Sequence, residues 1–423
     1  MNKLNDNVNK RHYFFTYLIC FVFLYALFVP SRIKSLLSFN VEEISTTNEI
    51  WIVLLVYVLL SLIRKFDISS PLQNKNKPFL IIIYTYILII IVGGFNIVSI
   101  SQYIYASLLF LTPLLIFFTI SYCSCKDIRL LLKVFIVACL IYSIFSIVLS
   151  MSYTFFVGLI GDYLDQHHNY SQFRANTMLG SSITVSYYFN MTLPLCFYMF
   201  YNSKEKKWRT ISALTISTNI AATFILLSRA AVLCTIFIVL FNIFFMKNNK
   251  NKFKARLILA LLLLLVSIFT IKNYDLSRLA LGINRVESSV ALRLTSGKLG
   301  LHIFTKYPFW GSGMGRYFKR AYTDNARYII VDGMTGLIDP HNMYILILSE
   351  MGMIGFIVTM VMFLLLFNRF LRIKEKALSK TACLTLFAFL LDAMGGSHLF
   401  ISISFSTLFW TYMGVFNNIY LKG

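Results

Sequence analysis

Charged residues are scarce in this 423-residue sequence, and acidic residues are the scarcest of them. Charged side chains make up 13% of the chain, whereas 58% of the residues are hydrophobic and 16% are aromatic. A soluble core cannot absorb that much apolar surface, whereas a bilayer accepts it directly. The 39 Lys and Arg residues outnumber the 17 Asp and Glu residues, but they occur in short clusters between apolar runs. This pattern is typical of loops that flank membrane helices and argues against a nucleic-acid-binding surface.

Motifs for metal binding, disulfides and secretion are also lacking. The seven cysteines lie mostly inside apolar runs, where we interpret them as small hydrophobic residues. Cys123 and Cys125 share one short loop, but no second pair with zinc spacing occurs elsewhere. No small-residue cleavage site follows the first apolar run, Tyr13 to Val29, so we expect this run to be a membrane span.

The apolar runs predict an all-α polytopic membrane protein with about twelve transmembrane helices. Several runs are near the lower limit of about 17 residues for a span. The polar segment 31–48 is expected to lie along the outer surface. The predicted helices lie near residues 13–30, 50–63, 79–100, 104–121, 130–150, 177–200, 210–228, 230–246, 257–272, 341–367, 381–397 and 398–418.

The basic residues predict the orientation of these helices. Alternate loops, together with both ends of the chain, carry 25 of the 39 Lys and Arg residues. The opposite side carries 14, of which ten lie in one long loop, and only short loops decide topology. Both termini are therefore expected in the cytoplasm. The predicted parts are helices one to nine at 1–272, a large helical outer loop at 273–340, and helices ten to twelve at 341–423.

His341 is the first candidate for chemistry, at the end of the long outer loop. Asp339 is a favoured N-cap residue, and Pro340 is favoured at the first helical position, which places His341 in the first turn of the tenth helix. The positive helix end disfavours an imidazolium, so His341 should stay neutral and able to accept a proton. The same helix end could bind an anion such as phosphate. An interfacial histidine that only bonds to the backbone is the alternative.

Two arginines are candidates for binding an anion. Arg229 lies between the seventh and eighth predicted helices, where an arginine usually has a fixed anionic partner. Its alternative is a side chain that reaches to lipid headgroups. Arg293 lies in an apolar stretch of the outer loop, which predicts an amphipathic helix at the surface; its alternative is a solvated charge.

Other residues offer weaker signals. The Gly-rich stretch Pro308 to Gly315 lacks the Gly-Lys-Ser/Thr of a nucleotide-binding loop. Glu350 and Asp392 are acids inside predicted helices and could suggest a proton or ion pathway. Glu350 lies nine positions after His341, about half a turn out of phase, so it should point away from the His341 face.

These segments together resemble a known signature. Pro308-Phe309-Trp310-Gly311-Ser312-Gly313, then Pro340-His341-Asn342-Met343-Tyr344, then Glu350-Met351-Gly352-Met353-Ile354-Gly355, resemble the O-antigen ligase and polymerase superfamily. Ser228-Arg229 and Arg293 resemble the arginines upstream of that signature, and the resemblance covers roughly residues 210–367.

The resemblance implies a GT-C-like, metal-independent glycosyltransferase of the bacterial inner membrane, without a cofactor. Its substrates would be undecaprenyl-pyrophosphate-linked glycans at the outer leaflet. His341 would be the general base, and Arg229 and Arg293 would bind the pyrophosphate and stabilise its charge. Asn342, Arg316 and Arg320 would add substrate contacts. The partners implied are the lipid-linked glycans, the bilayer, and the chain-length regulator and flippase of the same pathway, but no nucleic acid.

Three functions stay open at this point. The Pro-His-Asn-x-Tyr context at 340–344 favours a polymerase, which joins repeat units while they are on the carrier. A ligase would transfer the finished glycan to lipid A–core or another acceptor. A flippase or transporter is a third reading, but transporters of this size are commonly built from repeated halves, and no duplication is visible.

Overall fold

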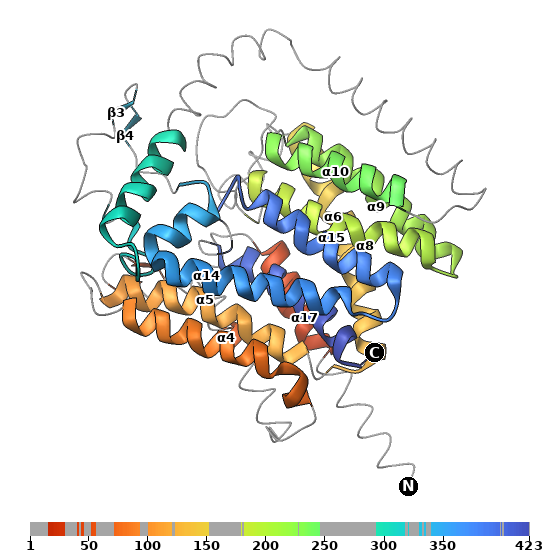
Figure 1. Cartoon of the computed structure of the whole chain (residues 1–423). Coiled ribbons are helices and arrows are strands. Elements are labelled where there is room, and N and C mark those ends of the chain that lie inside the picture. Colours follow the sequence, from red (N-terminus) through yellow and green to blue (C-terminus); the bar gives the residue numbers. More distant parts are fainter. Residues whose placement is uncertain are drawn as a thin grey trace.

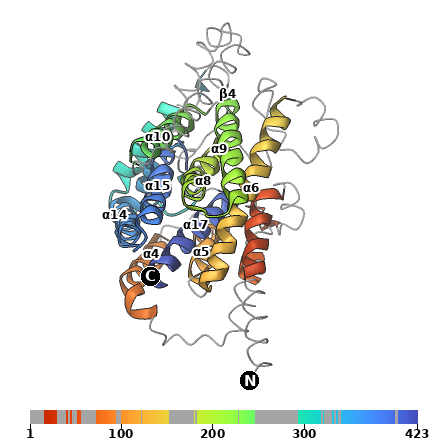
Figure 2. The same ribbon diagram turned by 90° about the vertical axis from the view of Figure 1, so that its right-hand side faces the viewer.

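The computed structural model is a bundle of helices (Figures 1 and 2). The structure describes residues 16–29, 40–41, 44–45, 52–55, 72–93, 100–120, 123–151, 179, 182–226, 228–245, 293–317, 320, 330–331, 334–335, 340–397, 399 and 402–422. The labelled helices are α4 (Leu72–Gly93), α5 (Ile100–Ile120), α6 (Cys125–Met151), α8 (Ser182–Asn202), α9 (Lys206–Ile225), α10 (Arg229–Phe245), α14 (Met343–Leu371), α15 (Lys376–Asp392) and α17 (Ile403–Lys422). Further helical residues are 16–28, 52–55 and 293–306.

The prediction from apolar runs agrees with these helices over most of the chain. Ten of the twelve predicted runs coincide with described helices. The run at 50–63 is described only at 52–55, and the run at 257–272 lies outside the described residues. By length and composition, Cys125–Ser150 and Met343–Leu371 can cross a membrane, and shorter apolar helices accompany them. The number of spans and the division into 1–272, 273–340 and 341–423 stay predictions.

Two short antiparallel hairpins interrupt the helical pattern. β1 (Asn40–Val41) pairs with β2 (Ile44–Ser45), and β3 (Ile330–Val331) pairs with β4 (Met334–Thr335). The outer loop that was predicted to be helical thus contains a described helix at 293–306 and this second hairpin at 330–335. Strands of two residues give no alternating pattern long enough to be recognised in a sequence.

The outward surfaces of three helices are apolar. On α4, Ile81, Tyr84, Leu88 and Ile91 follow helical spacing and are 54–65% exposed. Equivalent exposed side chains on α10 and α14 are Leu233, Ile236, Phe237, Leu240, Met353, Ile357, Val361 and Leu364. Soluble monomers rarely expose such contiguous apolar stripes. With the long apolar helices, these stripes indicate a membrane protein.

α8 forms the centre of one half of the bundle. It packs against α9, α15, α10 and α6, and its residues are almost all buried from Ser182 to Phe197 (Figure 2). α17 is similarly enclosed and packs mainly against α5, while α14 packs against α4 and α15. A helix that is buried all round is the expected core of a membrane bundle.

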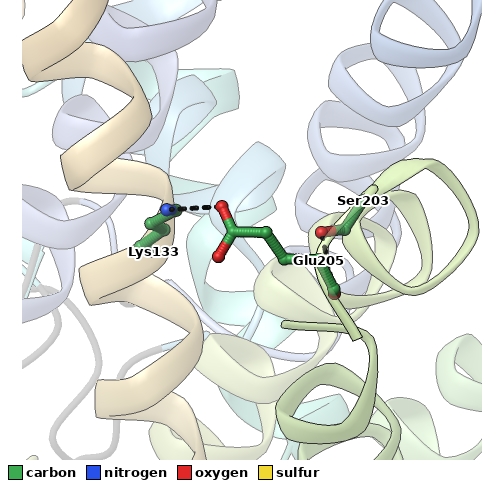
Figure 3. A network of polar contacts seen from close by, with 3 residues as sticks. All are labelled: Lys133, Ser203 and Glu205. Carbon is green, nitrogen blue, oxygen red and sulfur yellow. Dashed lines mark hydrogen bonds and ion pairs between the residues drawn. The ribbon is translucent and has the colours of Figure 1, made fainter. Parts of the chain in front are cut away.

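One end of the bundle gathers basic turns. Lys133 of α6 lies 3.7 Å from the Glu205 carboxylate in the turn between α8 and α9 (Figure 3), and its ammonium group lies over the Trp208 ring. Tyr198 Oη donates to Glu375 Oε1 at 2.7 Å, which joins the end of α8 to the turn between α14 and α15. The start of α6 and these two turns therefore lie at the same end, as alternate loops of a bundle should.

Candidate active site

His341 lies immediately outside α14. The N-cap of this helix is Asn342, whose side chain accepts from the amides of Tyr344 (2.9 Å) and Ile345 (3.2 Å). The predictions of Asp339 as the N-cap and of His341 in the first turn are therefore wrong, since the Asn342 amide oxygen takes the free amides of that turn. His341 has a φ of 46°, the one positive value among the described non-glycine residues. Such conformations concentrate at functional sites.

The end of α15 holds the start of α14 in place. Met343 N donates to Ala393 O at 3.0 Å, and Asn342 Nδ2 donates to Met394 O at 3.2 Å. Tyr344 Oη donates to Leu390 O at 2.8 Å, in the last turn of α15. The turn at residues 393–395 therefore fixes the backbone next to His341.

The same 393–395 turn contacts the start of α10. Arg229 is the first residue of α10, and the preceding Ser228 is buried and accepts from Val232 N at 2.8 Å. A Cβ atom added at Gly395 would lie 3.1 Å from Ala230 Cβ, so the two segments are in close contact. The structure thus brings the backbone of Arg229 and that of His341 to one turn, although the Arg229 side chain lies outside the described residues.

Arg293 is the first described residue of a surface helix at 293–306, shown in teal in Figure 1. The side chain is exposed, as predicted for an amphipathic surface helix. A Cβ at Gly300 would lie 2.6 Å from Ile345 Cγ2 and 3.9 Å from Pro340 Cβ, and one at Gly297 would lie 3.5 Å from Ile345 Cδ1. Arg293 therefore sits about one turn from the contact between this helix and the start of α14.

Arg316, which was predicted to contact substrate, lies beside the Gly-rich stretch. Its side chain is only 2% exposed, and Nη1 donates to Ser312 O at 3.2 Å. Among the described residues, Nε and Nη2 have no hydrogen-bond partner. Burial, and then the nearby Arg320 guanidinium, lower the pKa of Arg316. The guanidinium of Arg320 lies over the Tyr307 ring at 5.0 Å. The contacts of Arg316 thus join it to the Gly-rich stretch and not to His341.

The Gly-rich stretch 308–315 is bound to a break in α14. The helix is interrupted at Gly352, with φ 66° and ψ −168°. The amides of Met353 and Ile354 lose the helical carbonyls four residues earlier. They donate instead to Pro308 O at 2.8 Å and to Phe309 O at 3.2 Å.

The two carbonyls released by the break are also bonded to this stretch. Ser349 O accepts from Ser312 N at 3.0 Å, and Glu350 O accepts from Gly313 N at 2.8 Å. A Cβ at Gly311 would lie 2.3 Å from the Glu350 carbonyl carbon, so only glycine permits the approach. All four released backbone groups are satisfied, which irregular backbone within a membrane protein requires.

Glu350 supports this arrangement with its side chain. The carboxylate is buried and accepts from Tyr317 N at 3.1 Å. Tyr317 Oη in turn donates to Ser296 O at 2.7 Å on the surface helix. Glu350 therefore has a structural contact with the residues that directly follow the Gly-rich stretch. The described residues contain no group of three or more His, Cys, Asp or Glu side chains placed to hold a metal ion.

Sequence reasoning missed two residues beside this region. They are Asn190 on α8 and Thr235 on α10, both fully buried. The two side chains are hydrogen-bonded to each other, and Asn190 also donates to the Asp392 carboxylate and to Ala231 O on α10. The available signals were an asparagine amide in the middle of one predicted span and a threonine in the first half of another.

Two comparisons bear on this site. Residues 212–360 match the family model described as O-Antigen ligase. The matched segment contains Arg229, Arg293, the Gly-rich stretch, His341 and the break at Gly352. The comparison with curated proteins finds no match to the chain.

Proposed function

We propose that this chain, whose residues 212–360 match the O-Antigen ligase family model, is a membrane glycosyltransferase of the O-antigen polymerase and ligase superfamily that polymerises lipid-linked oligosaccharide repeat units. The substrates are undecaprenyl-pyrophosphate-linked glycans at the outer leaflet of the bacterial inner membrane. The product is O-antigen or another surface polysaccharide. The flippase and the chain-length regulator of the same pathway are its proposed partners.

The proposed reaction needs one base and a set of cations. An acceptor hydroxyl attacks the anomeric carbon of the donor sugar, and the bond from that carbon to the pyrophosphate oxygen breaks, with inversion. An imidazole nitrogen of His341 takes the hydroxyl proton. Arg229 and Arg293 stabilise the negative charge on the departing lipid pyrophosphate. Asn342, Arg316 and Arg320 are proposed to contribute substrate contacts.

The observation that carries the proposal is the convergence on the 393–395 turn. The helix start at Arg229 and the residue before the α14 cap, His341, flank this turn, and the surface helix of Arg293 packs on the same first turn of α14. His341 also has the left-handed φ that the surrounding hydrogen bonds maintain. The backbone positions of His341, Arg229 and Arg293 thus lie at one end of the bundle, and a base and two cations are the groups that the proposed glycosyl transfer uses.

The polymerase reading rests on the Pro340-His341-Asn342-Met343-Tyr344 context. The ligase alternative uses the same base and cations but a different acceptor, lipid A–core. The flippase alternative uses no base. Because the three functions act at different steps of glycan assembly, a different intermediate accumulates when each is absent.

A gel of surface glycans from a deletion strain tests all three. Loss of a polymerase leaves lipid core that carries a single repeat unit. Loss of a ligase leaves bare core while polymer accumulates on the carrier lipid. Loss of a flippase leaves repeat units on the cytoplasmic side.

The base assignment is tested in the same strain by complementation. We expect His341→Ala to reproduce the deletion while the protein remains in the membrane. His302→Ala is the matched control, since His302 is an exposed histidine on the 293–306 helix, and it should restore the normal ladder. A normal ladder from His341→Ala rejects the catalytic-base proposal.

A further inference from the structure

A buried hydrogen-bond network joins three helices beside the candidate site. Asn190 of α8, Thr235 of α10 and Asp392 at the end of α15 are each 0% exposed. Asn190 Nδ2 donates to Asp392 Oδ2 at 2.9 Å and to Ala231 O at 3.0 Å. Asn190 Oδ1 accepts from Thr235 Oγ1 at 2.6 Å. The Asn190 amide thus has partners on two other helices.

This network joins helices in an apolar interior at a cost in desolvation free energy. Buried polar and acidic groups carry a desolvation penalty, and apolar residues of similar volume often stabilise such contacts equally well or better. A fully satisfied polar network, however, defines one arrangement of its helices, because a shift of any partner leaves a buried group without its bond. The network therefore fixes the positions of α8, α10 and the end of α15 relative to one another.

The positions that it specifies are those of the two helix starts. Ala231, which accepts from Asn190, lies two residues after Arg229 in the first turn of α10. On the other side, Asp392 O accepts from Gly395 N at 2.9 Å and so shapes the 393–395 turn. The carbonyls of that turn bind Met343 and Asn342, next to His341.

We infer that Asn190 and Asp392 are positioning residues that hold the Arg229 end of α10 and the His341 end of α14 in register. The inference rests on the proposed function, since it assumes that Arg229 and His341 act on one substrate. Catalytic groups need placement within about 0.5 Å, and a displacement of about 1 Å can lower a rate about 100-fold. A network that fixes both helix starts therefore affects turnover more than it affects binding.

The experiment uses purified full-length protein and undecaprenyl-pyrophosphate-linked repeat units as substrate. For Asp392→Ala we expect kcat to fall by about ten-fold or more while KM changes by less than about three-fold, because the alignment of His341 with Arg229 matters more in the transition state than in the bound ground state. Asp392→Asn should retain at least about half of kcat, since its amide oxygen still accepts from Asn190.

The matched control is Thr192→Val on the same helix. Thr192 Oγ1 and Tyr412 Oη are hydrogen-bonded at 2.8 Å, and this bond joins α8 to α17, which carries no predicted site residue. Thr192→Val removes a comparable buried bond, so its loss of thermal stability calibrates the structural effect. Its kcat per folded molecule should stay within about two-fold of the unmodified protein.

Gly395→Ala provides a test that keeps the network itself. Its Cβ would lie 2.7 Å from Tyr187 Oη and 3.1 Å from Ala230 Cβ, which displaces the turn from α10. We expect the same fall in kcat as for Asp392→Ala. An unchanged kcat for this variant would contradict the inference even if Asp392→Ala does not fold.

Two results overturn the inference. One is a kcat of Asp392→Ala, per folded molecule, equal to that of Thr192→Val. The other is an unchanged kcat for Gly395→Ala. Failure of the base assignment is recognised separately, because His341→Ala would then keep its kcat whatever the network variants do.

Discussion

Gly352 has a backbone conformation that other residues rarely adopt, and its surroundings leave no room for a side chain. Its φ is 66°, and an added Cβ would lie 2.3 Å from Phe309 O and 2.5 Å from Gly311 N. Both neighbours are backbone atoms that take part in or adjoin the bonds across the break in α14. The steric conflict cannot be relieved by rotation of a side chain.

We therefore expect Gly352→Ala to lower the stability strongly. The unfavourable φ alone costs about 1–3 kcal/mol, and the clash adds to it. The measurement is thermal unfolding of the detergent-purified protein. Gly297→Ala is the control, since its Cβ would make an ordinary 3.5 Å contact with Ile345 and alanine favours a helix. Equal unfolding temperatures for the two variants would contradict the geometry at the break.

Replacement of Arg316 can separate a role in substrate binding from a role in protein stability. Its guanidinium is buried with two unbonded nitrogens, so replacement by an apolar side chain of similar length removes a desolvation penalty. If Arg316 contacts substrate, Arg316→Met should reduce polymer formation by about ten-fold or more while thermal stability is unchanged or higher. Lys298→Met, at an exposed position on the 293–306 helix, is the charge control. Full activity of Arg316→Met would exclude the substrate contact.

At the scale of the element, α14 shows what the sequence could and could not predict. Its apolar run, its position after the long loop and the identity of its signature residues were readable. Its first residue was misplaced because Asp339 and Pro340 satisfy statistical preferences for a helix start, whereas the bonds of Asn342 decide the actual one. The break at Gly352 was not predictable, because its bonding partners lie about 40 residues away in the chain.

The cap of α14 gives a prediction that isolates one pair of hydrogen bonds. Asn342→Ala removes the acceptor for the amides of Tyr344 and Ile345 and should cost about 0.5–2 kcal/mol. Asn342→Ser also loses the bond to Met394 O but keeps a cap acceptor. Thermal unfolding should therefore rank the original protein first, the serine variant second and the alanine variant last. A serine variant no more stable than the alanine variant would assign the effect to Met394 instead.

At the scale of the whole molecule, the apolar runs define the helices but not their neighbours. Periodicity reports that α8 is apolar, whereas only the packed bundle shows that Asn190 meets Asp392, 202 positions later in the sequence. The same limit applied to the site. His341, Arg229 and Arg293 were selected by residue type and motif, but the 393–395 turn that joins two of them has no signature of its own.

The bundle also makes a sharp prediction about sidedness. α8 and α14 finish at the end that holds Glu205, Glu375 and the start of α6, so the helix starts at Arg229 and His341 lie at the opposite end. The basic turns at the first end predict that it is cytoplasmic. Cys125, at the start of α6, is exposed, whereas the other six cysteines are buried. The unmodified protein therefore carries one natural reporter of the cytoplasmic end.

A membrane-impermeant maleimide applied to intact spheroplasts tests this orientation. We expect no labelling of the unmodified protein until the membrane is permeabilised, because the end that carries Cys125 is predicted to be cytoplasmic. In a Cys125→Ser background, Lys298→Cys should be labelled in intact spheroplasts, since Lys298 is exposed on the helix that packs beside His341. Labelling of Cys125 from outside would reverse the orientation and place His341 away from lipid-linked glycans of the outer leaflet. Labelling of both positions from one side would contradict the bundle itself, because the two residues belong to opposite ends.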